Sequence, residues 1–171
     1  MTQKEFLNSI ANGEMDILQL FLDLLKKHEI DYCVIGGLAV NAYVEPVVSL
    51  DLDLVVAADS IDKIVKMAQK TFNIKKFEHS LNLKSPKSDM RIQLQTDARY
   101  QAFIPEASPK KVMGYEMKVA ALEDVLQGKI WAYSDTQRRK SKRQKDLADI
   151  FRLVEAHHHL NNLLPESIKS L

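Results

Sequence analysis

The chain has 171 residues, 46% of them hydrophobic and 27% charged, which suits one domain with a real core, or a domain with a small helical appendage. Its formal net charge of +1 argues against a chain built wholly as a polycation for nucleic acid. The single cysteine, Cys33, excludes an internal disulfide, and no apolar run is long enough to cross a bilayer, so we expect a reduced, soluble, cytoplasmic protein with no membrane partner.

The first 72 residues alternate between helical and extended patterns. Leucines with helical spacing follow Asp16, which favours a first helical turn, and precede Lys26 and Lys27, which favour a last one. Ser60 stands before an amphipathic segment, at the position of an N-cap. The predicted elements are a helix over residues 14–29, a strand over 32–35, a short helix over 38–43, a strand over 50–57 and a helix over 61–72.

After residue 73 the apolar residues recur at every second position, which indicates strands. The predicted elements are a hairpin around residues 81–83 and 92–94, a strand over 117–120, a helix from about residue 122, a polar basic connector over 135–145 and a helix over 145–160. This order predicts an α/β (α+β) fold, in which helices flank a mixed sheet. Residues 1–121 would form the core with an N-terminal helix, and residues 122–171 a C-terminal helical part packed on it.

Two aspartates stand inside a strand that otherwise has the pattern of a buried one. Asp51 and Asp53 are two positions apart, so their side chains leave the same face of the strand, with Cα atoms about 6.5–7 Å apart. Carboxylates this close repel one another unless a positive charge lies between them. A solvated strand face is the alternative, but aspartate is depleted in strands. The pattern favours a Mg²⁺ site, because Mg²⁺ takes one or two carboxylates together with substrate phosphates.

A glycine pair precedes this motif, where a strand turns into a helix. Gly36 and Gly37 permit close approach of the backbone, and free N–H groups at the start of a helix attract an anion. Glycine in such a turn often serves the backbone alone. Close to a D-x-D motif, however, the pair favours a phosphate cradle. The chain has neither the dinucleotide-binding glycine motif nor the P-loop.

Together these residues resemble a known family. The stretch VIGGLAVNAY…SLDLDLVV is similar to the nucleotidyltransferase superfamily with the polymerase-beta-like fold, and within it to the small bacterial branch of abortive-infection-type toxin nucleotidyltransferases. The segments MGYEMKVAALEDVLQGKIWAY and KRQKDLADIFRL resemble later parts of that branch. The resemblance implies that Asp51 and Asp53 hold Mg²⁺ and that the glycine pair approaches the triphosphate of an NTP. Ser49, Lys129 and Lys145 are implied as lesser nucleotide contacts.

The chain departs from the family pattern at two positions. The family carries a third carboxylate on a later strand, and here the segment RIQLQT places Gln93 at that point. Glutamine cannot take a proton from an attacking hydroxyl, and a missing general base lowers a rate by about 10²–10⁴. Asp89 and Asp97 would replace it only in a different register. The family's arginine before D-x-D is Val47 here, so a cationic phosphate contact is missing or supplied elsewhere.

Residues 138–145 form a basic cluster that is either a contact surface for an RNA or DNA acceptor or a solvated loop. The solvated loop is favoured, because no aromatic residue is interleaved to stack with bases. Asp146 and Asp149 would cap or pair with the cluster, and a structural role is favoured for Asp149. Three consecutive histidines, residues 157–159, point in different directions on a helix and cannot ligate one ion.

The leading interpretation is a Mg²⁺-dependent nucleotidyltransferase that moves a nucleoside monophosphate from an NTP to an acceptor hydroxyl on RNA, a protein or a small molecule. Asp51, Asp53 and Gln93 would form its reaction centre. The alternative is a catalytically weak or inactive protein of the same fold, acting as a nucleotide-binding or regulatory module, for instance in a toxin–antitoxin pair. Gln93 and Val47 favour it. A glycosyltransferase D-x-D is a third interpretation, which the glycine pair and the K-D-x-x-D-I helix disfavour.

Overall fold

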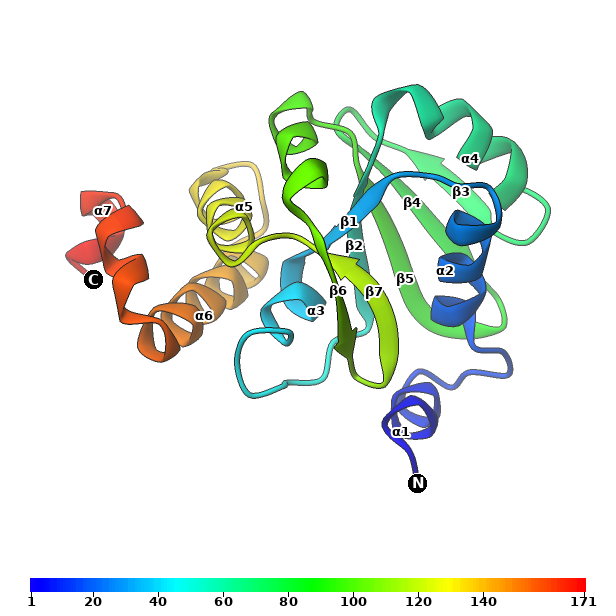
Figure 1. Ribbon diagram of the computed structural model, residues 1–171, viewed down its shortest axis with the longest axis horizontal. Helices are drawn as coiled ribbons and strands as arrows, with labels where there is room; N and C mark the ends of the chain where they lie inside the picture. The colour runs from blue at the N-terminus through cyan, green and yellow to red at the C-terminus, as the bar shows by residue number, and fades with distance from the viewer.

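The apolar run at residues 32–35 forms β1 (Tyr32–Ile35), which is buried along its whole length. It pairs antiparallel with β2 (Asp51–Val56) and parallel with β7 (Tyr115–Val119). β2 pairs parallel with β5 (Ser88–Gln95), so the sheet is mixed, as predicted. This computed structural model describes residues 1–171, and its seven strands lie in the order β3-β4-β5-β2-β1-β7-β6 (Figure 1). The remaining strands are β3 (Asn73–Lys76), β4 (Ser80–Ser85) and β6 (Ser108–Val112).

β4 and β5 form the hairpin that the alternating pattern predicts. Their apolar residues Leu81, Leu83, Ile92 and Leu94 are buried on one face, and the polar residues between them point to the other. The edge strands β3 and β6 are not predicted, because NIKK and SPKKV hold too few apolar residues to show an alternation. They form through pairing with β4 and β7.

The predicted helices are present, with shifted ends. Asp16 is the N-cap of α2 (Ile17–Lys27), and its carboxylate accepts a hydrogen bond from the Gln19 N–H. Ser60 is the N-cap of α4 (Ile61–Ala68), as predicted, but its side chain makes no capping hydrogen bond. Its backbone is helical rather than extended, and an extended backbone is what lets a capping hydroxyl reach the next turn. The other helices are α1 (Gln3–Ile10), α3 (Gly36–Val40), α5 (Leu122–Ser134), α6 (Lys140–Ala156) and α7 (Glu166–Lys169), with 3₁₀ segments η1 (Ala58–Ser60), η2 (Ala98–Glu106) and η3 (His158–Leu163).

The predicted basic connector over residues 135–145 is wrong in its extent. α6 begins at Lys140, so only residues 135–139 join it to α5. Lysine, arginine and glutamine are good helix formers, and a run of them contains no apolar residue that would reveal a helical period. Further along α6, Ile150 and Val154 are buried. The histidine run follows the end of this helix, with His157 at its C-cap.

The two faces of the sheet are covered differently. α2 contacts β5, and its Phe21 packs edge-on against Phe72, which lies in the turn between α4 and β3. α3 and η2 contact β1 and β2, and α5 and α6 pack against α3 (Figure 1). The polar residues of β4 and β5 beside this second group of helices stay partly exposed, among them Asn82 and Gln93. A groove therefore remains between the helices and this half of the sheet.

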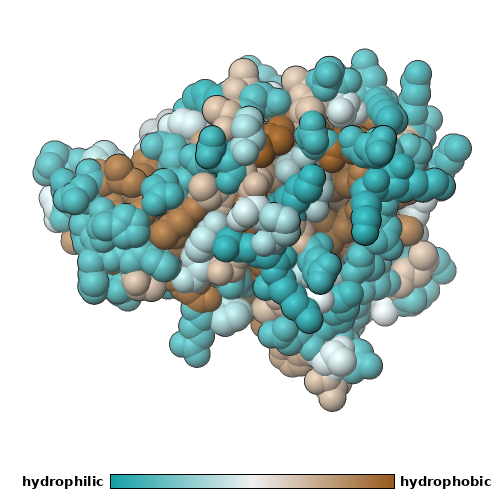
Figure 2. All heavy atoms as spheres, viewed as in Figure 1, coloured by the Kyte–Doolittle hydropathy of each residue, from teal (hydrophilic) through white to brown (hydrophobic).

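The surface shown in Figure 2 is mainly hydrophilic, with hydrophobic side chains in smaller patches. None of the helices has the length and the apolar character that crossing a membrane requires. Cys33 is fully buried in β1, and burial raises the pKa of its thiol to about 12, which leaves it unreactive at neutral pH.

Candidate functional site

The groove has Asp53 at its centre. Three adjoining cavities meet there, and Asp53 and Arg138 line all three. β2 contributes the aspartates, α3 the glycines, α5 and α6 the lysines, and β5 the glutamine. The groove brings together every site residue that the sequence predicts: Asp51, Asp53, Gln93, Gly36, Gly37, Ser49, Lys129 and Lys145.

Gly36 is the residue that lets the backbone approach Asp53. Its φ is +72°, in the left-handed region, and a Cβ built there would overlap the Asp53 carboxylate. Gly37 has more room, since its Cβ would lie 3.3 Å from the Ser49 hydroxyl oxygen. The glycine pair thus packs the start of α3 against the acidic strand. Contact between these glycines and a triphosphate stays a prediction.

The two aspartates differ in their partners. Arg91 binds Asp51, with its Nε 2.6 Å from one carboxylate oxygen, and Lys142 Nζ lies 3.7 Å from the other. Asp53 makes no such ion pair. Burial, and next the nearby charge of Asp51, raise the pKa of Asp53 to about 6, although Lys129 and other cations oppose the shift. Asp53 is therefore the carboxylate that lacks a compensating cation.

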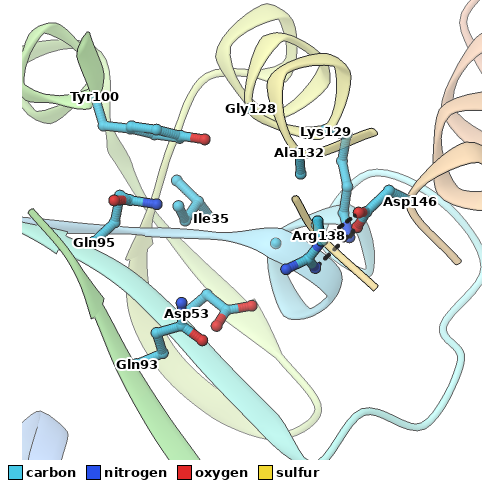
Figure 3. Close-up of a pocket in the computed structure, with 11 residues that line it drawn as sticks. Ile35, Asp53, Gln93, Gln95, Tyr100, Gly128, Lys129, Ala132, Arg138 and Asp146 are labelled. Atoms are coloured by element: carbon cyan, nitrogen blue, oxygen red, sulfur yellow. Dashed lines mark hydrogen bonds and ion pairs between the residues drawn. The ribbon is translucent and has the colours of Figure 1, made fainter. Parts of the chain in front are cut away.

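The predicted register at Gln93 agrees with the structure. β2 and β5 pair so that Gln93 stands directly beside Asp53, and Figure 3 shows both side chains on neighbouring strands at the pocket. Asp89 instead accepts a hydrogen bond from the Asn12 amide at 2.7 Å. Asp97 binds its neighbour Arg99 at 3.0 Å. Neither aspartate replaces the missing carboxylate.

A buried ionic network forms the opposite wall of the groove (Figure 3). Lys129 Nζ lies 3.1 Å from Asp146 and 2.8 Å from Asp149, and Arg138 Nε lies 2.7 Å from Asp146. Burial alone would lower the pKa of Lys129, but Asp149 and Asp146 outweigh it and hold that pKa above its usual value. Asp149 also binds Arg152 at 2.8 Å, which gives it the structural role that the sequence favours.

The predicted solvated loop at residues 138–145 is wrong for its inward-facing members. Arg138 and Lys142 face the groove, and Arg143 donates a hydrogen bond to the Tyr133 carbonyl oxygen at 2.7 Å. Lys145 is exposed at the rim. The helical spacing of α6 turns some of these side chains toward the groove and others toward solvent. That spacing cannot be seen in an unbroken run of charged residues.

Four cations of the groove are not predicted as site residues: Arg91, Arg138, Lys142 and Arg152. Val47, where the family carries an arginine, is 56% exposed and lines the same cavity as Lys142, Lys145 and Arg152. Cations from α6 therefore reach the region that this arginine would serve. Only the strand register could have revealed Arg91, since it lies beside Asp51.

The donor set of the site suits a magnesium ion. Asp51 and Asp53 are the only carboxylates that the D-x-D strand offers, and no group of three or more histidines, cysteines, aspartates or glutamates is arranged so that it could hold a metal ion. Mg²⁺ commonly binds through one or two carboxylates while waters and phosphates complete its shell. A cation beside Asp53 would also relieve its repulsion from Asp51.

Solved structures with a similar fold are nucleotidyltransferases. The complex of ANT(2″)-Ia with adenylyl-2″-tobramycin is 13% identical, with a TM-score of 0.61, and the match covers 90% of this chain and 91% of that one. The lincosamide antibiotic adenylyltransferase LnuA, with lincomycin bound, is 12% identical, with a TM-score of 0.57 and coverage of 82% and 98%. An antigenic nucleotidyltransferase-like protein from Paracoccidioides brasiliensis is 19% identical, with a TM-score of 0.52 and coverage of 90% and 78%.

No protein-family model and no curated protein matches the chain. At such identities the structural likeness establishes the fold, and the predicted nucleotidyltransferase-like fold is confirmed. The particular reaction has to be argued from the residues of the groove.

Replacing Gly36 with alanine should destabilise the protein by about 1–3 kcal/mol, because alanine disfavours this φ and its Cβ would overlap the Asp53 carboxylate. Urea unfolding measures the change. Gly37→Ala is the matched control and should have a smaller effect. Equal losses in the two variants would contradict the role assigned to Gly36.

Asp53→Asn should stabilise the unliganded protein by roughly 1–2 kcal/mol at pH 7, since it removes a carboxylate whose charge is disfavoured in the fold. Between about pH 4 and pH 6 the folded state retains a proton that the unfolded chain has lost, so this carboxylate lowers stability as pH rises. The advantage of the variant should grow over the same interval in thermal unfolding at several pH values. Asp51→Asn, which breaks the Arg91 ion pair, should not stabilise.

Lys129→Met should lower the free energy of unfolding by about 3–5 kcal/mol, because it leaves Asp146 and Asp149 with one cation fewer in a buried setting. Lys145→Met, at the exposed rim of the same groove, should change it by less than about 0.5 kcal/mol. Chemical denaturation of both variants checks the difference. Similar small changes in both would show that the network contributes little to folding.

Proposed function

We propose that this protein binds an NTP with Mg²⁺ and transfers its nucleoside monophosphate to an acceptor hydroxyl. The observation that carries the proposal is the pair of aspartates on one face of β2, with Asp53 uncompensated at the centre of a groove whose other walls are cationic. The nucleotidyltransferase fold of the structural neighbours supports it.

The chain's own residues would divide the work. Asp51 and Asp53 would hold Mg²⁺, which, when bound, neutralises phosphate charge and polarises the reacting phosphoryl group. Lys142, Lys145 and Arg138 line the groove and would bind the triphosphate oxygens. These are positioning and electrostatic roles, which dominate catalysis of phosphoryl transfer.

In the transfer, the acceptor oxygen bonds to the α-phosphorus as the bond to the departing pyrophosphate breaks. Gln93 stands beside Asp53 and would accept a hydrogen bond from the attacking hydroxyl through its amide oxygen. It cannot take the proton, which therefore leaves to water. The reaction would be slow compared with that of an enzyme that has a carboxylate at this position.

A nucleotide-binding module is the second candidate, and Gln93 is the observation that favours it. Such a module would keep the metal and triphosphate contacts but turn over little. The sequence resemblance suggests a regulatory role in a toxin–antitoxin pair, and we include that role in this second candidate. Among the structural neighbours, LnuA is a lincosamide antibiotic adenylyltransferase, and ANT(2″)-Ia was solved in complex with adenylyl-2″-tobramycin. A small-molecule acceptor is therefore a further option for the active enzyme.

Titration calorimetry with ATP, GTP, CTP and UTP, with and without Mg²⁺, tests the binding step. At least one NTP should bind only in the presence of Mg²⁺, and the Asp51→Asn/Asp53→Asn variant should lose that binding. Lys76→Gln, far from the groove on the edge strand, is the control and should bind as the unaltered protein does. Absence of binding to all four NTPs would remove both candidates.

Gln93→Asp separates the two candidates. A carboxylate restored beside Asp53 should raise the rate of labelled-nucleotide transfer by about 10²-fold if the unaltered protein is a slow enzyme. Transfer from α-labelled NTP onto cell RNA, protein and small molecules measures it. If the unaltered protein shows no transfer and the variant shows none either while binding Mg·NTP, the protein is a binding module.

A further inference from the structure

A polar face of β3, β4 and β5 continues the groove toward the edge of the sheet. The strand registers place Lys75 opposite Asn82, Asn82 opposite Gln93, and Gln93 opposite Asp53, so these four side chains form one row on the same face. Lys84 and Arg91 lie opposite one another in the adjoining row, beside Asp51. With strands about 4.8 Å apart, the row runs about 14 Å outward from Asp53. We call this surface the polar sheet face.

The outer part of the polar sheet face, on β3 and β4, carries Lys75 and Lys84 and no carboxylate. Lys84 stands directly opposite Arg91, and like charges in this relation destabilise a sheet. Arg91 is already bound to Asp51, and neither Lys75 nor Lys84 has a carboxylate partner. The only carboxylate on the three strands, Asp89, is held by Asn12 at the hairpin end. An anion lying over the two lysines would relieve this imbalance.

Asn82 supplies a second, independent observation. Its Oδ1 is the one buried side-chain oxygen or nitrogen in the protein that has no hydrogen-bond partner. It lies in the lining of the cavity that Asp53, Gln93 and Lys84 also line. Leaving a buried acceptor unpaired is unfavourable, so a ligand that donates a hydrogen bond here would remove a penalty. Amino groups of bases and ribose hydroxyls are such donors.

An aromatic ring lies at the outer end of the row. Phe77, just after β3, is 44% exposed, and Lys75 Nζ lies 5.2 Å from the centre of its ring. An exposed ring next to a lysine is the combination on which single-stranded nucleic acids stack a base and pair a phosphate. An acidic peptide would satisfy the lysines but would leave the ring and the Asn82 acceptor without specific partners.

We propose that the polar sheet face binds single-stranded nucleic acid. A base stacks on Phe77, Lys75 and Lys84 bind phosphates, and Asn82 accepts a hydrogen bond from a base or sugar. The strand's terminal hydroxyl then reaches Gln93 and Asp53. The last step rests on the proposed transferase function, whereas binding of the strand does not. At its inner end this surface meets the basic residues 138–145, because Asn82 and Lys84 line the same cavity as Arg138 and Lys142, whereas Lys75 and Phe77 lie outside that cavity.

Fluorescence anisotropy with labelled single-stranded RNA and DNA oligonucleotides, on the full chain, tests the proposal. The Lys75→Gln/Lys84→Gln variant should bind about tenfold more weakly, and its salt dependence should be shallower by about 1.4, the slope expected for two lost phosphate contacts on a single strand. Phe77→Ala should also weaken binding. Lys76→Gln, the neighbouring lysine on the other face of β3, is the matched control and should bind normally.

The outcomes separate this proposal from the transferase function. Equal affinity of the lysine variant and the control, or no oligonucleotide binding at all, would overturn the proposal. So would a duplex of the same sequence, or polyglutamate, that binds as tightly as the single strand. Mg·NTP binding is measured in the Phe77→Ala variant, whose ring lies outside the groove, and should be unchanged. If the unaltered protein binds no Mg·NTP but binds the oligonucleotide through the lysines, the transferase proposal is wrong and the proposal that the polar sheet face binds nucleic acid is supported.

Discussion

The structure depends on the electrostatic repulsion between two neighbouring carboxylates in β2. Asp51 and Asp53 leave the same face of β2 and repel one another, and Asp53 lies where water cannot screen it well. Much of what surrounds them is cationic. Arg91 on the next strand and Lys142 on α6 neutralise Asp51. Asp53 is left without a partner, and the proposed Mg²⁺ site rests on that observation.

The C-terminal helices are joined to the site by the same kind of interaction. Lys129 and Arg138 would add unpaired charge to a buried wall, and Asp146 and Asp149 compensate them. A buried ion pair seldom adds much net stability over an apolar contact, but removing one partner is strongly unfavourable. The network thus fixes α5 and α6 in one arrangement against the groove.

How much of this the sequence reveals depends on where the signal lies. The buried strand at residues 32–35 and the hairpin follow from local periodicity, and the acidic pair and Gly36 lie close enough together in the chain to be read as one motif. Arg138 and Lys142 could not be found this way, because their place in the groove comes from the packing of a helix distant in sequence from Asp53. Their neighbours in the chain are also charged, which masks the helical period. β3 and β6 escape prediction for a related reason, since their strands are set by partners rather than by composition.

The route of the chain through the groove has a consequence for biosynthesis. Asp53 and Gln93 belong to the earlier part of the chain, whereas Arg138, Lys142 and Asp146 belong to its last third. A nascent chain can therefore assemble the acidic strand and the sheet before the cationic wall exists. The groove is completed only when α6 has emerged and docked, so its cationic wall forms after the acidic strand and the sheet rather than together with them.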